Sequence, residues 1–381
     1  MRFVKSLLLS AALFSTTTLA AQADVKVVAS IKPVHSLVAA VMEGVAMPSL
    51  IVDGAGSPHT YALKPSQAQD LQDAELVFWM GHQLEAFLEK PIEAIAGKAK
   101  AVELLDAHDL VNLKFREGGA FDEHGHEEGK EDEHSGHDDH NDHDEHKHDE
   151  HAEEKDHDTH KHDERAEEKD HDEHKHEEHA EGESPDEHKH DEHAEDEDHK
   201  DHDEHAHGEY DPHVWLDPVN AKALVHEIEE ALVETDSDNA KKYEANAKAV
   251  MAKIDALTAE VSADLAPVKG RGFVVFHDAY QHFESRFGLA AVGSVTVSPE
   301  VIPGAERIGE LRAKVKGLKA ACVFSEPQFE SKLVSTVSEG TDAKPGVLDP
   351  LGTGIENGPE LYFMLIRNMA ASFKSCLSEA S

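Results

Sequence analysis

The chain has 381 residues, 30% of them charged, and a formal net charge of −43 at pH 7. Most of this charge is local, because residues 121–209 contain 41 Asp and Glu against 9 Lys and Arg, a net of −32 that leaves −11 for the remainder. This balance makes nucleic acid and anionic lipid poor partners. Without this segment and the N-terminal leader, about 270 residues remain, enough for two modest lobes.

The N-terminus has the pattern of a secretory signal peptide over residues 1–23. Arg2 and Lys5 supply the positive start, Leu7–Leu19 the short apolar stretch, and Ala21-Gln22-Ala23 the small-residue cleavage site. The alternative is a retained N-terminal helix. No Cys follows the cleavage site and no later segment is apolar enough to cross a membrane, so we expect a soluble, exported protein without a membrane anchor.

Apolar runs alternate with helical patterns through the first part of the mature chain. The pattern predicts strands at Val25–Ser30, Ser49–Val52 and Leu76–Met80, and helices at Val34–Gly44 and Ser66–Asp73. Such alternation is typical of an α/β fold with a parallel sheet.

The second part repeats this alternation. The pattern predicts strands at Gly272–Phe276, Ala291–Val297, Ala320–Ser325 and Gly346–Leu348, and helices at Tyr280–Phe287, Ala305–Val315 and Pro359–Cys376. Between the two parts, Pro218–Leu265 is rich in Ala, Glu and Lys and has no Pro after its start, which predicts a helical connector of one or two pieces. We therefore expect two α/β lobes with parallel sheets joined by a long helix.

The acidic segment 121–209 also holds 23 of the 31 histidines and almost no apolar residues, which predicts a disordered insert. A His-Lys-His motif recurs every 14 residues, but no apolar a/d positions support a coiled coil. Imidazole and carboxylate are ligands of Zn²⁺, Ni²⁺ and Cu²⁺, so the insert is interpreted as an accessory metal-binding tract. Its repeated histidines are His146, His148, His160, His162, His174, His176, His188 and His190.

Four residues outside the insert are candidate metal ligands. His59 lies in a turn after a predicted strand, His213 follows the insert directly, and His277 and Asp349 each follow the end of a predicted strand. Strand ends are where open α/β sheets bind ligands, and three imidazoles with a carboxylate or a water form a plausible tetrahedral zinc site.

Other polar residues receive simpler interpretations. Asp278 and Tyr280, beside His277, are expected to orient imidazoles through hydrogen bonds. His108, His226 and His282 are expected to be solvated. Export favours a disulfide between Cys322 and Cys376, with two buried free thiols as the alternative.

Six motifs, in this order, resemble the metal-binding periplasmic components of ABC importers (cluster A-I), and most closely the zinc-specific ZnuA-type members. They are GSPHTYALKPSQ (56–67), LVFWMGHQLEAFLEK (76–90), DPHVWLDP (211–218), VFHDAYQHFESRFGL (275–289), SEPQF (325–329) and LDPLG (348–352). The resemblance implies two α/β lobes bridged by a long helix, with the metal between them. It also implies periplasmic location and, as partners, an inner-membrane permease and its ATPase.

Carried over by position, the family's ligands are His59, His213 and His277, and Asp349 matches a carboxylate ligand of many members. Manganese-type members tend to have Glu where this chain has His277, so the resemblance favours zinc, in line with ligand softness. Some zinc-specific members have Glu where this chain has Pro58, which leaves the fourth ligand open between Asp349 and water. The two cysteines match a disulfide of zinc-type members.

The resulting segments are the signal peptide 1–23, an N-terminal lobe 24–120 with 210–233, the insert 121–209, a linking helix 234–267 and a C-terminal lobe 268–381. We expect a monomeric protein that captures Zn²⁺ for an ABC importer, with the insert collecting or buffering zinc. The alternatives are a periplasmic zinc store and an importer component for Mn or Ni. A secreted zinc hydrolase is disfavoured, because the chain has no HExxH, no Ser nucleophile elbow and no evident general base.

Overall fold

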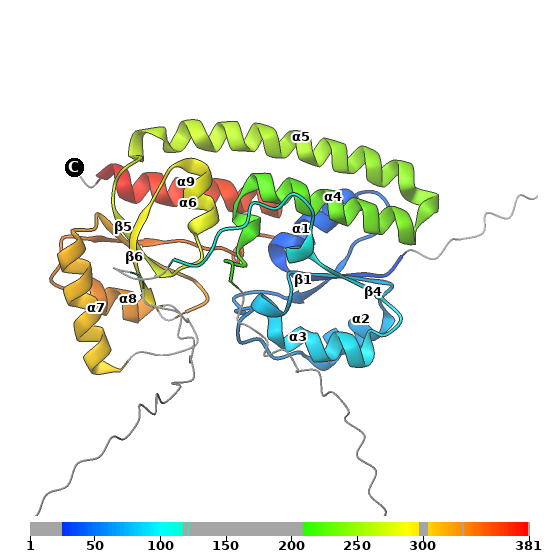
Figure 1. Cartoon of the computed structure of the whole chain (residues 1–381), viewed down its shortest axis with the longest axis horizontal. Coiled ribbons are helices and arrows are strands. Elements are labelled where there is room, and N and C mark those ends of the chain that lie inside the picture. Colours follow the sequence, from blue (N-terminus) through cyan, green and yellow to red (C-terminus); the bar gives the residue numbers. More distant parts are fainter. Residues whose placement is uncertain (1–24, 117–120, 122–208, 297–303, 330, 380–381) are drawn as a thin grey trace, which may run out of the picture. The chain divides into compact units, whose positions relative to one another are not determined.

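The computed structural model describes residues 25–116, 121, 209–296, 304–329 and 331–379 (Figure 1). The predicted signal peptide, the eight repeated histidines and all of the insert except Phe121 and Glu209 lie outside the described residues. Within the described part, no helix is both long enough and apolar enough to span a membrane.

The N-terminal lobe is built on a parallel four-stranded sheet with the order β2-β1-β3-β4. Its strands are β1 (Val27–Ile31), β2 (Ser49–Val52), β3 (Leu76–Trp79) and β4 (Lys100–Glu103). Its helices are α1 (Lys32–Val41), α2 (Pro65–Asp73), α3 (His82–Ile95) and the short 3-10 helix η1 (Leu104–Asp106). Every residue of β1 and β3 is buried, which explains their uninterrupted apolar sequences.

The C-terminal lobe repeats this plan with a parallel sheet of order β6-β5-β7-β8. Its strands are β5 (Phe273–His277), β6 (Ala291–Thr296), β7 (Cys322–Ser325) and β8 (Lys344–Val347). Its helices are α6 (Gln281–Phe287), α7 (Ala305–Leu318), α8 (Ser331–Ser338) and α9 (Leu361–Glu379). The prediction of two parallel α/β lobes is confirmed.

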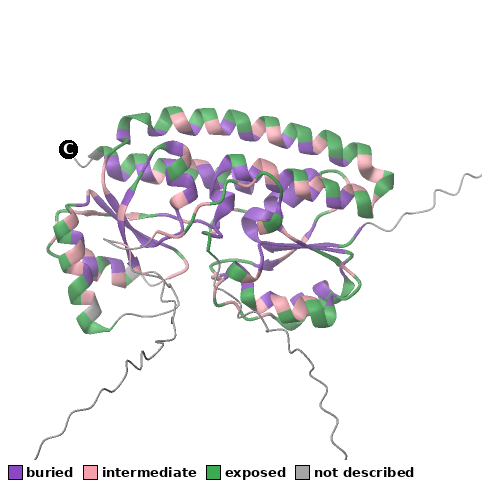
Figure 2. Ribbon diagram, in the orientation of Figure 1, coloured by how far each residue is buried: buried purple, intermediate pink, exposed green. Residues whose placement is uncertain are grey.

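The connector between the lobes consists of two long helices and short 3-10 turns. These are η2 (Val214–Leu216), α4 (Pro218–Thr235), η3 (Ser237–Asn239), α5 (Ala240–Leu265) and η4 (Ala266–Val268). Helix α5 packs on α4 and on α1 of the first lobe and on α9 of the second. It buries one stripe and leaves its other face exposed (Figure 2); the stripe is Tyr243, Ala247, Val250, Ile254, Leu257, Val261 and Leu265.

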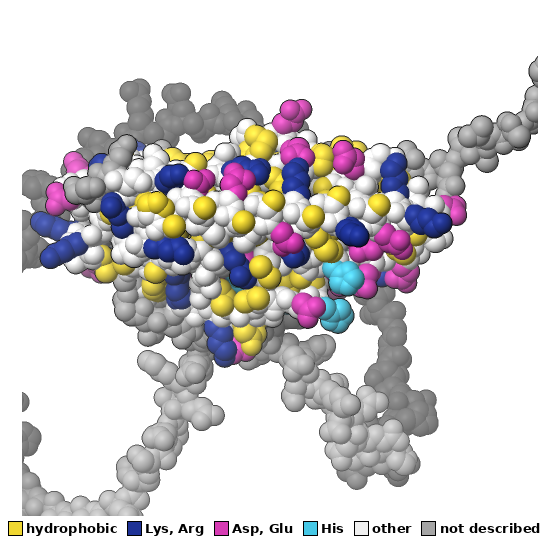
Figure 3. All heavy atoms as spheres, turned by 90° about the horizontal axis from the view of Figure 1, so that it is seen from above, with side chains coloured by type: hydrophobic (Ala, Val, Ile, Leu, Met, Phe, Trp, Pro, Cys, Tyr) yellow, Lys and Arg dark blue, Asp and Glu magenta, His cyan; other side chains and the backbone are white. Residues whose placement is uncertain are grey.

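The surface around α5 carries both signs of charge, interspersed (Figure 3). Several of these side chains are paired, including Lys222 with Asp255 at 2.7 Å and Lys374 with Asp264 at 2.7 Å. Mixed charge of this kind produces no strong field of one sign. The large net charge of the chain therefore does not come from this face.

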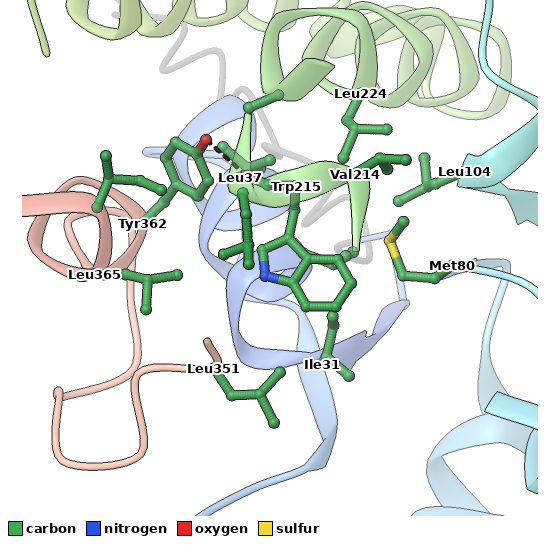
Figure 4. Packing of buried hydrophobic residues seen from close by; sticks show 14 of the residues in the cluster. Ile31, Leu37, Met80, Leu104, Val214, Trp215, Leu224, Leu351, Tyr362 and Leu365 are labelled. Atoms are coloured by element: carbon green, nitrogen blue, oxygen red, sulfur yellow. Dashed lines mark hydrogen bonds between the residues drawn. The ribbon is translucent and has the colours of Figure 1, made fainter. Parts of the chain in front are cut away.

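Trp215 joins the two lobes through a shared apolar core (Figure 4). Its side chain is 1% exposed, and its indole Nε1 donates to the carbonyl of Pro350 at 2.9 Å. Tyr362 of α9 donates its hydroxyl to the Trp215 carbonyl at 2.9 Å. These two hydrogen bonds hold the segment 350–362 against the N-terminal lobe.

The predicted disulfide between Cys322 of β7 and Cys376 of α9 is present.

Candidate metal site

Three imidazoles from three separate segments meet at one point. His59 lies in the turn after β2, His213 immediately precedes η2, and His277 is the last residue of β5. One ring nitrogen of each lies within 4.8 Å of those of the other two, and the ring centroids are 5.3–5.8 Å apart. The structure therefore brings together the three histidines predicted from the sequence.

The imidazoles are withdrawn from solvent to different degrees. His213 is 5% exposed and His277 is 4% exposed, whereas His59 is partly accessible at the edge of the group. Burial, together with the neighbouring His213 and His277, holds the pKa of His59 well below its usual value. His59 is therefore neutral at physiological pH, which is the form that binds a metal ion.

Two buried carboxylates hold two of these rings. Asp211 Oδ1 lies 2.7 Å from Nδ1 of His213 and accepts the backbone N–H of the same residue at 3.0 Å. Glu326 Oε1 lies 2.6 Å from Nδ1 of His277. A ring that donates through Nδ1 presents Nε2 as a ligand, and Nε2 of His277 is buried without a hydrogen-bond partner among the described residues. Both pairs thus have the imidazole–carboxylate arrangement typical of metal-binding histidines.

These pairings also affect the charge of each group. Burial lowers the pKa of His277, but attraction to Glu326 and its hydrogen bond outweigh this effect and raise the pKa above its usual value. For Asp211, burial raises the pKa, yet interaction with His213 and His282 brings it below its usual value. Asp211 is therefore a buried anion that also stabilises positive charge beside it.

Neither carboxylate was predicted from the sequence to contact an imidazole, although Asp211 lies in the motif DPHVWLDP and Glu326 in SEPQF. Glu326 directly follows β7, and β7 is the neighbour of β5 in the sheet. Since parallel strands end at the same edge, the strand order would have placed Glu326 beside His277. Asp211 lies two residues before His213, a spacing that allows one carboxylate to contact both the backbone and the ring of that histidine.

Asp278 and Tyr280, which were predicted to orient imidazoles, lie beside His277 and contact different groups. The carboxylate of Asp278 binds the guanidinium of Arg116, with Nε of Arg116 3.0 Å from Oδ2. The Tyr280 ring lies 6.3 Å from the His277 ring, and its hydroxyl is buried. Burial, with the nearby Glu326 and Asp349 carboxylates, raises the pKa of Tyr280 well above its usual value. Tyr280 is therefore a neutral neighbour of the site.

Asp349 lies outside the group of three histidines. Its carboxylate accepts backbone N–H groups from Leu351 at 3.1 Å, Gly352 at 3.0 Å and Thr353 at 2.6 Å, and the side-chain amide of Gln328 at 2.9 Å. These contacts shape the loop that follows β8. The candidate fourth ligand thus has its oxygen atoms engaged in capping a loop.

A small cavity adjoins the imidazoles. Its volume is about 10 Å³, which suits about one water molecule. Besides the three histidines and Glu326, it is lined by Ser57, Pro58, Trp215, Gln328, Phe329, Pro350 and Leu351. The three imidazoles therefore border a small unfilled space.

One of the remaining histidines departs from expectation. His282 was expected to be solvated but is 1% exposed, with Nε2 3.1 Å from the carbonyl of Asp211. That prediction was wrong because α6 buries the adjacent residues His282 and Phe283, so its buried surface is not limited to one side of the helix. His108 and His226 are exposed, as predicted.

Two parallel α/β lobes, a helical connector and three clustered imidazoles define a two-lobed protein with a histidine metal site. Residues 27–376 match the family model described as ZnuA, zinc-uptake complex component A, periplasmic, and the chain belongs to this family. It is 52% identical over 353 residues to the high-affinity zinc uptake system protein ZnuA of Brucella suis biovar 1 (strain 1330), covering 93% of this chain and 92% of that protein.

More distant similarity extends over the same length. The chain is 33% identical over 356 residues to the ZnuA of Yersinia pestis, covering 93% of this chain and 92% of that protein. A crystal structure of ZnuA superposes with a TM-score of 0.60 at 20% identity, covering 92% of this chain and 100% of that one. At this identity the structural match supports the fold, which agrees with the two-lobe architecture.

Proposed function

We propose that this protein captures Zn²⁺ in the periplasm and delivers it to an inner-membrane ABC permease with its ATPase. The observation that carries this proposal is the group of three ring nitrogens, from His59, His213 and His277, within 4.8 Å of one another. Family membership supports the same function, because the relatives at 52% and 33% identity are described as high-affinity zinc uptake proteins.

The donor set suits zinc. With Zn–N distances of about 2.0–2.1 Å, tetrahedral coordination separates the ligand nitrogens by roughly 3.3 Å. The observed separations are at most 4.8 Å, so metal binding requires only a small contraction of the group. Three imidazoles favour zinc over harder ions such as Mn²⁺, which prefer oxygen ligands. Nickel remains the competitor to be tested.

We assign the fourth coordination position to water. The Asp349 carboxylate is engaged by three backbone N–H groups and by Gln328, so ligation would break the loop that it caps. This engagement favours water over Asp349 as the fourth ligand.

Transport, and not catalysis, is the proposed role of this centre. A water bound to a three-histidine zinc ion can also act as a nucleophile in hydrolysis. Such chemistry requires a base near that water, but the two carboxylates found beside the imidazoles, Asp211 and Glu326, are bonded to His213 and His277. Each carboxylate accepts from the Nδ1–H of its histidine, so neither is positioned as a base for the bound water.

The remaining parts of the proposal concern the flanking segments. We propose that residues 1–23 direct export, that the protein acts as a monomer, and that the histidines of the insert collect or buffer zinc near the site by raising its local concentration. The division into an N-terminal lobe at 24–120 with 210–233, a linking helix at 234–267 and a C-terminal lobe at 268–381 belongs to the same proposal.

A zinc titration against a chromophoric chelator tests the proposal with four proteins: the full chain, the chain lacking 122–208, His59→Ala, and the two changes combined. One tight site should survive the deletion and disappear with His59→Ala in both backgrounds. Loss of all tight binding on deletion, with His59→Ala unaffected, would instead identify a zinc store based on the insert. Competition with Ni²⁺ and Mn²⁺ on the deleted protein measures selectivity.

A further inference from the structure

The two chain segments that adjoin the insert are hydrogen-bonded to each other beside the metal site. Lys114 and Tyr210 form an antiparallel bridge, Phe115 N–H donates to the carbonyl of Glu209 at 3.4 Å, and Asp211 N–H donates to the carbonyl of Leu113 at 2.8 Å. We call residues 113–116 and 209–211 the stem. Its two short segments lie side by side, so a shift of one is transmitted to the other through these backbone hydrogen bonds.

The second segment of the stem ends on a metal-site residue. Asp211 donates its N–H to Leu113, while its carboxylate holds both the backbone and the ring of His213. The Asp211 side chain is 1% exposed, so water does not compete for these contacts. The position of the stem therefore determines where the His213 ring is held.

The first segment of the stem ends on Arg116, whose guanidinium contacts the other lobe. It makes a two-pronged contact with Asp278, and it binds Glu284 through Nη1 to Oε2 at 2.8 Å and Nη2 to Oε1 at 3.0 Å. Both carboxylates are buried, with side chains 6% and 3% exposed. The ring of Phe121 lies over the same guanidinium at 4.3 Å. Arg116 is thus fixed on several sides.

The two carboxylates lie in the turn and the helix that follow His277. Asp278 is the next residue in the chain, and Glu284 lies in α6 and also accepts the N–H of Ala291 at the start of β6, at 2.7 Å. Without a cation between them, two buried anions would repel each other and separate. The segment between them, 278–284, would then move, and His277 is its direct attachment.

We propose that Arg116 is a positioning residue of the metal site. Through Asp278 and Glu284 it fixes the turn that carries His277, and through the stem it ties that turn to Asp211 and His213. Two ligands from different lobes are thereby held at one spacing by the base of the insert. This inference rests on the proposed function, because it takes His213 and His277 as ligands.

The expected consequence is weaker and shorter-lived zinc binding when Arg116 is replaced. Residues that orient metal ligands typically contribute about 10–100-fold to metal affinity. Arg116→Gln in the full chain should therefore raise the dissociation constant of the tight site by about 10–100-fold, mainly through faster zinc release. Arg116→Lys should not restore it, because an ammonium cannot form the paired contacts with two carboxylates.

Arg286 provides a matched control. It lies in α6 and binds Asp217 through Nε at 2.6 Å and Nη2 at 2.8 Å, but Asp217 caps helix α4 and is not adjacent in the chain to a site histidine. Arg286→Gln removes an ion pair of similar geometry. It should change zinc affinity by less than about threefold.

A triple variant separates positioning from loss of charge balance. Arg116→Gln combined with Asp278→Asn and Glu284→Gln has no buried charges left to repel each other, so its thermal stability should return toward that of the parent. Zinc release from it should stay fast, and the visible absorption spectrum of the Co²⁺-loaded protein should differ from the parent spectrum, because the ion pairs that tie the turn after His277 to the stem are absent.

The measurement is stopped-flow zinc release and Co²⁺ absorption for the parent and the four Arg variants. Parent-like release from Arg116→Gln, equal effects of Arg116→Gln and Arg286→Gln, or full recovery in the triple variant would each overturn the inference. Failure of the proposed function gives a separate result, since His59→Ala would then retain the tight site whatever the Arg116 variants do.

Discussion

Glu85 provides a test of the fold that is independent of metal. This side chain in α3 is 0% exposed, and its Oε2 accepts the N–H of Met80 at 2.7 Å. Burial raises its pKa from 4.5 to about 7, despite hydrogen bonds from Ser30, Met80 and Gly81 that act in the other direction. The folded protein therefore binds a proton at Glu85 over a pH range in which the unfolded chain has lost it.

The sign of the effect on stability follows from this difference in proton binding. Between pH 4.5 and 7 the folded state holds more protons at Glu85 than the unfolded state, so stability falls as pH rises. A shift from 4.5 to about 7 corresponds to about 1 kcal/mol lost by pH 5 and about 3 kcal/mol lost by pH 8, at 1.36 kcal/mol per unit.

Glu85→Gln removes this titration while keeping an oxygen that can accept the Met80 N–H. Urea unfolding of metal-free parent and variant should therefore give a stability difference that grows by roughly 2–3 kcal/mol in favour of the variant from pH 5 to pH 8. The titrating histidines of the insert are common to both proteins and cancel in the difference. A stability difference that does not change with pH would show that Glu85 does not have a raised pKa in the folded protein.

Three further outcomes follow from the site and the core. Asp211→Asn and Glu326→Gln should each weaken zinc binding by about 10–100-fold, as measured by chelator competition, and unchanged affinity would contradict their role in holding the imidazoles. As pH is lowered, the zinc affinity of the parent should begin to fall while the pH is still above 6.5, because the raised pKa of His277 lets protons compete with zinc there. In Glu326→Gln the affinity should begin to fall only at lower pH, and identical pH profiles for the two proteins would count against the pairing of His277 with Glu326. Replacing Cys322 and Cys376, which are 54 residues apart, with Ala should lower the free energy of unfolding by about 4 kcal/mol in chemical denaturation, whereas a loss below about 1 kcal/mol would show that the bridge adds little.

The strands and the histidine ligands were accessible from the sequence because both are local signals. Buried parallel strands consist of consecutive apolar residues, and a His directly after such a run, as at His277, lies at the edge where ligands bind. By contrast, α3 was not predicted, since Pro91 lies inside it and Glu85 has non-helical backbone angles of φ −124° and ψ 51°. Strand β4 was also missed, because it is an edge strand with two exposed residues.

The contacts that hold the site could not be derived in the same way. Arg116 and Asp278 are 162 residues apart and belong to different lobes, so their pairing depends on how the lobes pack. His277 and Glu326 are 49 residues apart and meet only because β5 and β7 are neighbours in one sheet. Asp349 was a candidate ligand because it follows a strand, and in the structure its carboxylate accepts the N–H groups of its own loop. The sequence predicts in which strand or loop a residue lies, whereas tertiary packing determines which groups its side chain contacts.

In the proposed site, zinc is held by His59, His213 and His277 with a water as the fourth ligand. Zinc X-ray absorption of the protein lacking 122–208, loaded with one equivalent of Zn²⁺, measures this coordination shell directly. We expect three imidazole nitrogens at about 2.0–2.1 Å from the zinc and one oxygen ligand, and we expect Asp349→Asn to give the same spectrum. A shell with fewer than three imidazoles, or a spectrum that changes in Asp349→Asn, would contradict it.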